Sequence, residues 1–347
     1  MSKRNTMTET ANPAPLQSVM RASPHGKPTV NGDHQAQKGT GTFFLALMVS
    51  LLCIQLDYFF DAATGKTLLS YKQEHGYGTG PWDAAFVAFY AVVILLVKIL
   101  ITKQHPQALA TFFGAKSPQR FAEQLFSFVY FSCSTVFGLV IMQGRHPWSM
   151  DAQDLVAEVE AGTFEGKVKC FYLLQAGFWV QEALFIAFQL EKPRQDYVQL
   201  IFHHVITLVA IGLSYVGKYT DLGVMILVTH DASDAILSVA KLLRYVRSSF
   251  TGPAWLIFLF TWLYTRHYLM IPVIYLTWQF SSELDERGYS SLRKSSLFSM
   301  GLLVLIQTLN LYWLTFILRG FYKLLFSSGT TKDMRSDEED EGDSEEE

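Results

Sequence analysis

The chain has 347 residues, of which 50% are hydrophobic and 14% aromatic, while only 17% are charged. Its formal net charge is −3 at pH 7, and its apolar residues gather in long runs without the period of a surface helix or strand. These features exclude an ordinary water-soluble domain and a basic nucleic-acid-binding surface. They indicate a polytopic membrane protein.

The N-terminal segment, residues 1–41, is polar and lacks an apolar core. It also contains Pro13, Pro15, Pro24 and Pro28. This composition predicts a disordered cytosolic arm and no cleavable signal peptide, so the first apolar run would act as the insertion signal.

Runs of about 20 apolar residues are long enough to cross a hydrocarbon core about 30 Å thick. About eight such runs follow the arm and predict an all-α polytopic membrane protein. We assign residues 42–116 to the first two helices with their loops, and we expect six or seven helices to form a bundle around a cavity open to the cytosol. The predicted spans are 42–60, 82–101, 121–142, 169–190, 198–216, 221–240, 254–278 and 297–318.

The distribution of Lys and Arg predicts the orientation of the chain. These residues are more frequent in the two tails and in the loops after the second, fourth and sixth spans, which places both termini in the cytosol. The loop 143–168 is acidic and fits the lumenal side.

The C-terminal segment, residues 321–347, ends in the like-charge block DMRSDEEDEGDSEEE. Such a block cannot bury enough apolar surface to fold, so we expect a disordered cytosolic tail. Ser336 and Ser344 each precede an acidic run, which suits phosphorylation by an acidophilic kinase. The alternative is that the tail is only a solvated terminus and that phosphorylation does not regulate it.

The cysteines Cys53, Cys133 and Cys170 all fall in or at the ends of predicted spans. An odd number placed in this way argues against a disulfide framework and against a metal site built from thiolates. We expect no metal and no cofactor.

Ionisable side chains inside the predicted spans mark the candidate site, because each costs several kcal/mol at that depth unless it is paired or hydrated. His203 and His204 lie about a turn inside the fifth span, and the sixth carries His230, Asp231 and Asp234. The proposed topology brings the two sets together in the cytosolic half of the membrane. Adjacent residues on a helix point about 100° apart, so the two histidines should have unequal roles.

Further polar residues continue this pattern as supporting groups. Thr207 follows the histidine pair by one turn, and Ser238 and Lys241 extend the polar stripe of the sixth span. Arg266 lies in the middle of the seventh span and needs an anionic partner. Asp231 and Asp234 are both available for that role.

Histidine side chains near their ordinary pKa move protons, and a carboxylate behind an imidazole fixes its tautomer. A cytosol-facing cavity with apolar walls would admit a lipid tail together with a water-soluble head. Acyl transfer onto a lipid amine or hydroxyl fits this combination best. The imidazole would act either as the general base or as the nucleophile that carries the acyl group.

Residues 191–245, EKPRQDYVQLIFHHVITLVAIGLSYVGKYTDLGVMILVTHDASDAILSVAKLLRY, resemble the Lag motif of ceramide synthases. The resemblance includes the KPR-x-DY approach, the HH pair, the SY at Ser214 and Tyr215, and the HDxSD at residues 230–234. It extends over residues 117–320, which are similar to the larger TLC domain.

This resemblance implies transfer of a fatty acyl group from acyl-CoA to the amine of a sphingoid base, sphinganine or phytosphingosine, at the endoplasmic reticulum membrane. It makes His203 and His204 the catalytic pair and Asp231 and Asp234 the essential acidic residues. The loop 61–80 is too short for the homeobox-like segment of many animal members, so the chain resembles a fungal or other non-animal member.

Acyl-CoA would then be a substrate, and basic residues at the cytosolic entrance would attract its phosphates together with Arg266. For most of these basic residues, the alternative explanation is the general excess of Lys and Arg in cytosolic loops of membrane proteins. The possible protein partners implied by the resemblance are a small single-span regulatory subunit or a second copy of the chain. The basic residues are Lys192, Arg194, Lys241 and Arg244.

Two other functions compete with this interpretation. A di-iron lipid hydroxylase would need several HxxxH and HxxHH boxes, whereas the nine histidines here are mostly scattered outside any such box. A transporter or a non-enzymatic lipid-binding protein of the TLC type would use the same polar stripe without turnover.

Overall fold

The computed structural model describes residues 72–73, 76–143, 150–188 and 195–326, and these form helices together with one short pair of strands. Three predicted parts lie outside the described residues: the N-terminal arm, 1–41, the first span, 42–60, and the C-terminal tail beyond residue 326. The elements are β1 (Lys72–Gln73), β2 (Gly76–Tyr77), α2 (Pro81–Ile99), η1 (Leu100–Gln104), α3 (Pro106–Phe113), α4 (Pro118–Met142), α5 (Ala152–Ala161), α6 (Gly166–Ala187), α7 (Tyr197–Gly217), α8 (Thr220–Tyr245), α9 (Thr251–Leu263), η3 (Tyr264–Tyr268), α10 (Met270–Glu286) and α11 (Ser290–Phe326).

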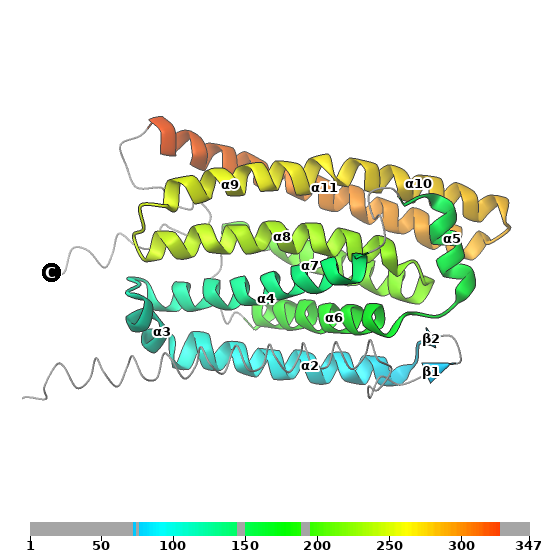
Figure 1. Cartoon of the computed structure of the whole chain (residues 1–347), viewed down its shortest axis with the longest axis horizontal. Coiled ribbons are helices and arrows are strands. Elements are labelled where there is room, and N and C mark those ends of the chain that lie inside the picture. The colour runs from blue at the N-terminus through cyan, green and yellow to red at the C-terminus, as the bar shows by residue number, and fades with distance from the viewer. Residues whose placement is uncertain (1–71, 74–75, 144–149, 189–194, 327–347) are drawn as a thin grey trace, which may run out of the picture.

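The long helices run side by side along the longest axis of the molecule, with the short helices α3 and α5 at opposite ends (Figure 1). Helix α8 packs chiefly against α4, and α2 packs against α6. Helices α7 and α8 are joined only by Lys218 and Tyr219, yet they touch each other little. Residues of both helices line a cavity.

Seven helical segments of the described chain are long and apolar enough to cross a membrane. They coincide with the second to eighth predicted spans, so the all-α polytopic prediction is confirmed. The seventh span consists of α9, the π-helical turn η3 and α10 in succession. Helix α11 continues to Phe326, past the predicted start of the C-terminal tail at residue 321.

Local sequence explains several helix boundaries. Pro81, Pro106 and Pro118 occupy the first turns of α2, α3 and α4, where a missing N–H costs nothing. Gly114 ends α3 in the left-handed conformation that glycine adopts most easily. Asp151 caps α5 through its side chain, which accepts from the backbone N–H groups of the first turn.

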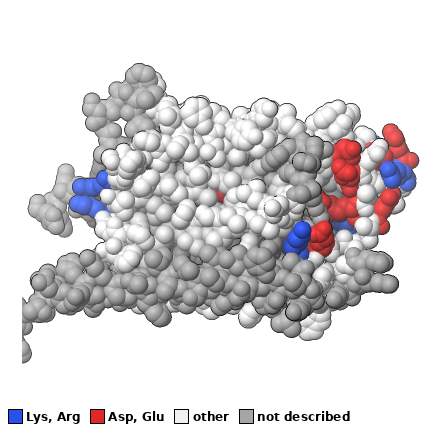
Figure 2. Space-filling model, viewed as in Figure 1, with Lys and Arg blue, Asp and Glu red and all other residues white. Residues whose placement is uncertain are grey.

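Charged residues gather at the two ends of the bundle. On the face shown in Figure 2, Lys and Arg occupy one end, a belt with very little charge forms most of the middle, and acidic residues dominate the other end. Lys103 of η1 and Arg244 of α8 belong to the first end, called the basic end here. Helix α5, which carries Asp154, belongs to the second, the acidic end.

A buried ion pair fastens α2 to the bundle near the acidic end. The Lys169 ammonium lies 2.8 Å from a carboxylate oxygen of Asp83 and donates to the carbonyl of Gly78. The hydroxyl of Tyr215, from the SY of the motif, donates to the other oxygen of Asp83 at 2.9 Å. These contacts satisfy the carboxylate in an apolar environment, and they join α2, α6 and α7.

Candidate active site

The histidine pair lies in the second turn of α7, where both side chains are buried. The ring centroids of His203 and His204 are 5.7 Å apart and the rings are nearly perpendicular, at 85°. The two rings are therefore oriented differently.

Two tryptophans hold His203 in place. The rings of Trp179, from α6, and Trp313, from α11, both stand edge-on to the imidazole, with centroids 5.5 and 5.4 Å away. Trp179 also stands edge-on to His204. The indole N–H of Trp313 donates to the buried carboxylate of Asp196 at 2.9 Å, so the residue before α7 fixes one wall of the histidine site.

Hydrogen bonds to the preceding turn constrain the other two imidazoles of the site. The Nδ1 atoms of His204 and His230 lie 2.7 and 2.8 Å from the carbonyl oxygens of Leu200 and Ile226. A carbonyl only accepts, so Nδ1 carries the proton in both residues and Nε2 keeps its lone pair. The Nε2 atom of His230 is buried without a hydrogen-bond partner and is therefore available to a ligand.

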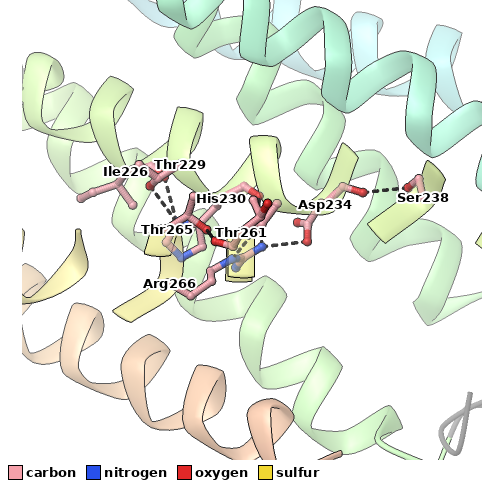
Figure 3. A network of polar contacts seen from close by, with 9 residues as sticks. Ile226, Thr229, His230, Asp234, Ser238, Thr261, Thr265 and Arg266 are labelled. Atoms are coloured by element: carbon pink, nitrogen blue, oxygen red, sulfur yellow. Dashed lines mark hydrogen bonds and ion pairs between the residues drawn. The ribbon is translucent and has the colours of Figure 1, made fainter. Parts of the chain in front are cut away.

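Arg266 is presented inward by η3, and π-helical turns of this kind are frequent at functional sites. Its guanidinium donates to a carboxylate oxygen of Asp234 at 2.7 Å (Figure 3). A second hydrogen bond goes to the Ser233 hydroxyl at 2.8 Å. It also donates to the carbonyl of His230 and lies over the ring of Trp262, 4.7 Å from its centroid. Of the two aspartates that the sequence offers, Asp234 is thus the ion-pair partner.

Asp231 points to a different side of α8. Its carboxylate is completely buried and accepts hydrogen bonds from the Ser134 hydroxyl of α4 and from the Gln175 amide of α6. Asp231 lines neither of the two cavities at the histidine pair. The network connects α8 to α4 and α6, and the predicted catalytic role of Asp231 stays a prediction.

Two cavities meet at the histidine pair. The first, the vestibule, extends toward the basic end, and the second, the channel, extends toward the acidic end. They share four lining residues, Trp179, His203, Asp234 and Arg266. Of the two cavities, His204 lines only the vestibule and His230 lines only the channel.

The walls of the two cavities differ in character. Charged residues line the vestibule, including the ion pair of Lys98 and Glu182 at 2.6 Å, and also Glu123 and Lys241. The four shared residues are called the neck here. Beyond the neck, the channel is lined by aliphatic residues of α7, α8 and α11 and, in similar number, by uncharged residues with hydroxyl groups. The site can therefore hold a molecule with one polar and one apolar part.

Other predicted site residues fall into three groups. Thr207 lines the channel with its hydroxyl unpartnered, and Ser238 and Lys241 line the vestibule. Arg244 lies in the last turn of α8 and lines neither cavity. The residues outside the described part of the chain are Lys192, Arg194, Ser336 and Ser344.

Several site residues were missed by the sequence interpretation. Lys98 comes from α2, and its presence in an apolar run is the signal that could have revealed it. Glu182 and Asp196 also carry charge within or beside predicted spans. Nothing in the sequence distinguishes Trp179 and Trp313 from ordinary aromatic residues of a span. Within the described residues, no group of three His, Cys, Asp or Glu side chains is placed to hold a metal ion.

The fold and the site define a membrane-embedded helical bundle with an ionisable centre between a polar and an apolar cavity. Residues 120–319 match the TLC domain family. The chain therefore belongs to the TLC-domain family, as the resemblance of residues 117–320 predicts.

Similar proteins include two fungal relatives and one human one. Sphingosine N-acyltransferase lac1 of Schizosaccharomyces pombe is 34% identical over 275 residues, which cover 76% of this chain and 71% of the relative. Ceramide synthase LAG1 of Saccharomyces cerevisiae is 32% identical over 308 residues, 83% of this chain and 74% of the relative. Ceramide synthase 4 of Homo sapiens is 29% identical over 229 residues, 66% of this chain and 56% of the relative.

Proposed function

We propose that this protein is a ceramide synthase that transfers a fatty acyl group from acyl-CoA to the amine of a sphingoid base. The observation that carries the proposal is the position of His203, at the neck between a charged vestibule and an apolar channel. Both substrates combine a polar head with a long apolar chain, and relatives over most of the chain are named for this activity.

The cavities suggest where the parts of the substrates bind. The acyl chain occupies the channel, which places its thioester carbonyl at the neck beside His203. The CoA part lies in the vestibule, where Lys241 brings positive charge toward the phosphates, while the charge of Lys98 is balanced by its ion pair with Glu182. Arg266 is the further cation at the neck, although its charge is partly balanced by Asp234.

Acyl transfer forms a bond between the amine nitrogen and the carbonyl carbon, and it breaks the bond from that carbon to sulfur. The amine must lose a proton, and the departing thiolate of CoA must gain one. The Nε2 lone pair of His204 can take the first proton because Nδ1–H is held by Leu200. His203, which lines both cavities, is the group that contacts the carbonyl, either as a nucleophile or by orienting it.

The test is transfer by the purified protein in lipid vesicles, with palmitoyl-CoA and sphinganine as substrates and ceramide detected by mass spectrometry. We expect His203→Ala and His204→Ala to abolish product formation. His105→Ala changes a histidine before α3, which lines neither cavity, and serves as the matched control. Full turnover by either variant of the pair would refute the assignment.

We also propose that the protein lies in the endoplasmic reticulum membrane with its basic end and both termini in the cytosol. The support is that acidic residues dominate one end of the face shown in Figure 2, whereas Lys and Arg are the charged residues at the other end, since positive charge favours the cytosolic side. Single cysteines at the exposed positions Gln107 of α3 and Gln153 of α5 form a matched pair for the test. In sealed microsomes, an impermeant maleimide should label Gln107→Cys and spare Gln153→Cys, and the reverse pattern would overturn the orientation.

A further inference from the structure

Two buried tyrosines close the channel at the acidic end. Tyr172 of α6 donates to the carbonyl of Thr220 at 3.1 Å, and its hydroxyl lies within hydrogen-bond distance of Ser214. The hydroxyl of Tyr219, in the connection between α7 and α8, forms a hydrogen bond of 2.9 Å with Ser299 of α11. Both buried hydroxyl groups are therefore satisfied.

Each tyrosine ring lies against a glycine. A Cβ atom added at Gly223 of α8 would collide with the hydroxyl of Tyr172, and one added at Gly217 of α7 would collide with the ring of Tyr219. The ring of Tyr219 also packs against Phe280 of α10, with centroids 5.5 Å apart. Because these rings are held on several sides, they form a rigid end wall.

The depth of the channel follows from the helix that runs along it. His203 and Ser214 both line the channel and are eleven residues apart on α7, so the neck lies about 16 Å from the closed end. One leaflet of a bilayer has about half of the hydrocarbon thickness of about 30 Å. The channel therefore has about the depth that a phospholipid chain, shortened by gauche bonds, occupies in one fluid leaflet.

We propose that Tyr219, held by Ser299 and backed by Tyr172, sets the maximum length of the acyl chain that the protein transfers. A palmitoyl chain, shortened by gauche bonds as in a fluid leaflet, fits between His203 and this wall, whereas a hexacosanoyl chain, ten carbons longer, does not. The inference rests on the proposed acyltransferase function, because it assigns the channel to the acyl chain of the substrate.

The first test is a competition between palmitoyl-CoA and hexacosanoyl-CoA for sphinganine in vesicles. We expect the wild-type protein to form mainly the palmitoyl product, and Tyr219→Ala to move the product ratio toward the longer chain by at least about tenfold, since even one misfit methylene discriminates by that factor. Tyr219→Phe keeps the ring, and Tyr289→Ala changes an exposed tyrosine outside the channel, so both should keep the wild-type ratio. An unchanged ratio in Tyr219→Ala, or a wild-type protein that uses both substrates equally, would overturn the proposal.

A second measurement needs neither turnover nor a folded variant. The wild-type protein is irradiated with a palmitoyl-CoA that carries a diazirine at its terminal carbon, and labelled peptides are identified by mass spectrometry. Labels on the peptides that contain Tyr172, Tyr219 or Ser299 support the proposal, and labels confined to the vestibule overturn it. Absence of ceramide from every acyl-CoA would refute the proposed function, while the labelling would still locate the end of the bound chain.

Discussion

The indole nitrogen of Trp313 donates a hydrogen bond of 2.9 Å to Asp196, although 117 residues separate them in the chain. The same indole ring stands edge-on to His203. The bond therefore joins the start of α7 to α11 and positions the imidazole at the neck of the two cavities. Asp196 belongs to the DY of the sequence motif, and its position accounts for an acidic residue so close to the histidines.

Removal of the Asp196 side chain should impair the site through the position of Trp313. Asp196→Ala leaves a buried indole N–H without its acceptor, which costs about 1–3 kcal/mol of stability, and it frees a wall of the His203 site. We expect kcat to fall more than KM changes. Asp196→Asn keeps an oxygen acceptor and should restore most of kcat, measured as ceramide formation in vesicles. An Asp196→Ala protein with unchanged kcat would contradict this role.

The pair of Arg266 and Asp234 should be necessary for stability. Asp234→Ala leaves a buried guanidinium without its carboxylate, and we expect a loss near the lower end of about 3–5 kcal/mol, because the Asp234 side chain keeps 22% exposure. Denaturant unfolding in detergent measures the change. The control is Asp285→Ala, which removes an exposed ion pair with Arg293 at the acidic end and should change stability by less than about 1 kcal/mol. Equal losses in both variants would contradict the prediction.

Asp231 should affect activity only through the packing of α8. Asp231→Ala deprives Ser134 and Gln175 of an acceptor, so we expect a lower unfolding free energy and, as a result, less active protein. Asp231→Asn keeps an acceptor oxygen and should retain turnover per folded molecule. A well-folded Asp231→Asn protein without turnover would show instead that this carboxylate takes part directly in the chemistry.

Glu158 of α5 should make stability depend on pH. Its carboxylate caps α8 by accepting from the backbone N–H of Thr220 at 2.7 Å and from that of Asp221. Burial, helped by the nearby carboxylate of Asp221, raises the pKa of Glu158 from 4.5 to about 7. In this range the folded protein holds a proton that the unfolded chain has released, so the folded state loses stability as pH rises from about 4.5 to about 7.

The measurement is the unfolding temperature in detergent at the two ends of that pH range, for the wild type and Glu158→Gln. The glutamine keeps an acceptor for the helix cap but does not titrate. We expect the wild type to lose more stability than the variant as pH rises. Identical pH profiles, or a smaller loss in the wild type, would contradict the assigned pKa.

The spans and the histidine pair could be predicted because both depend on local chemistry. An apolar run of sufficient length crosses the bilayer whatever its neighbours are, so seven predicted spans reappear as helices. His203, His204 and Asp234 are ionisable groups inside such runs, and their cost in lipid marks them without knowledge of their partners. The short helices α3 and α5 escaped prediction because they lie in loops and carry no long apolar run.

Pairing between helices could not be read in the same way, because it depends on how each helix is rotated about its axis. Asp231 and Asp234 looked equivalent as partners of Arg266, yet the packing of α8 on α4 turns Asp231 toward Ser134 and leaves Asp234 at the neck. Lys98 and Trp313 reach the site from α2 and α11, at opposite ends of the described chain. Local polarity thus selected the residues that must avoid lipid, whereas helix rotation and long-range packing decided which of them meet and separated the vestibule from the channel.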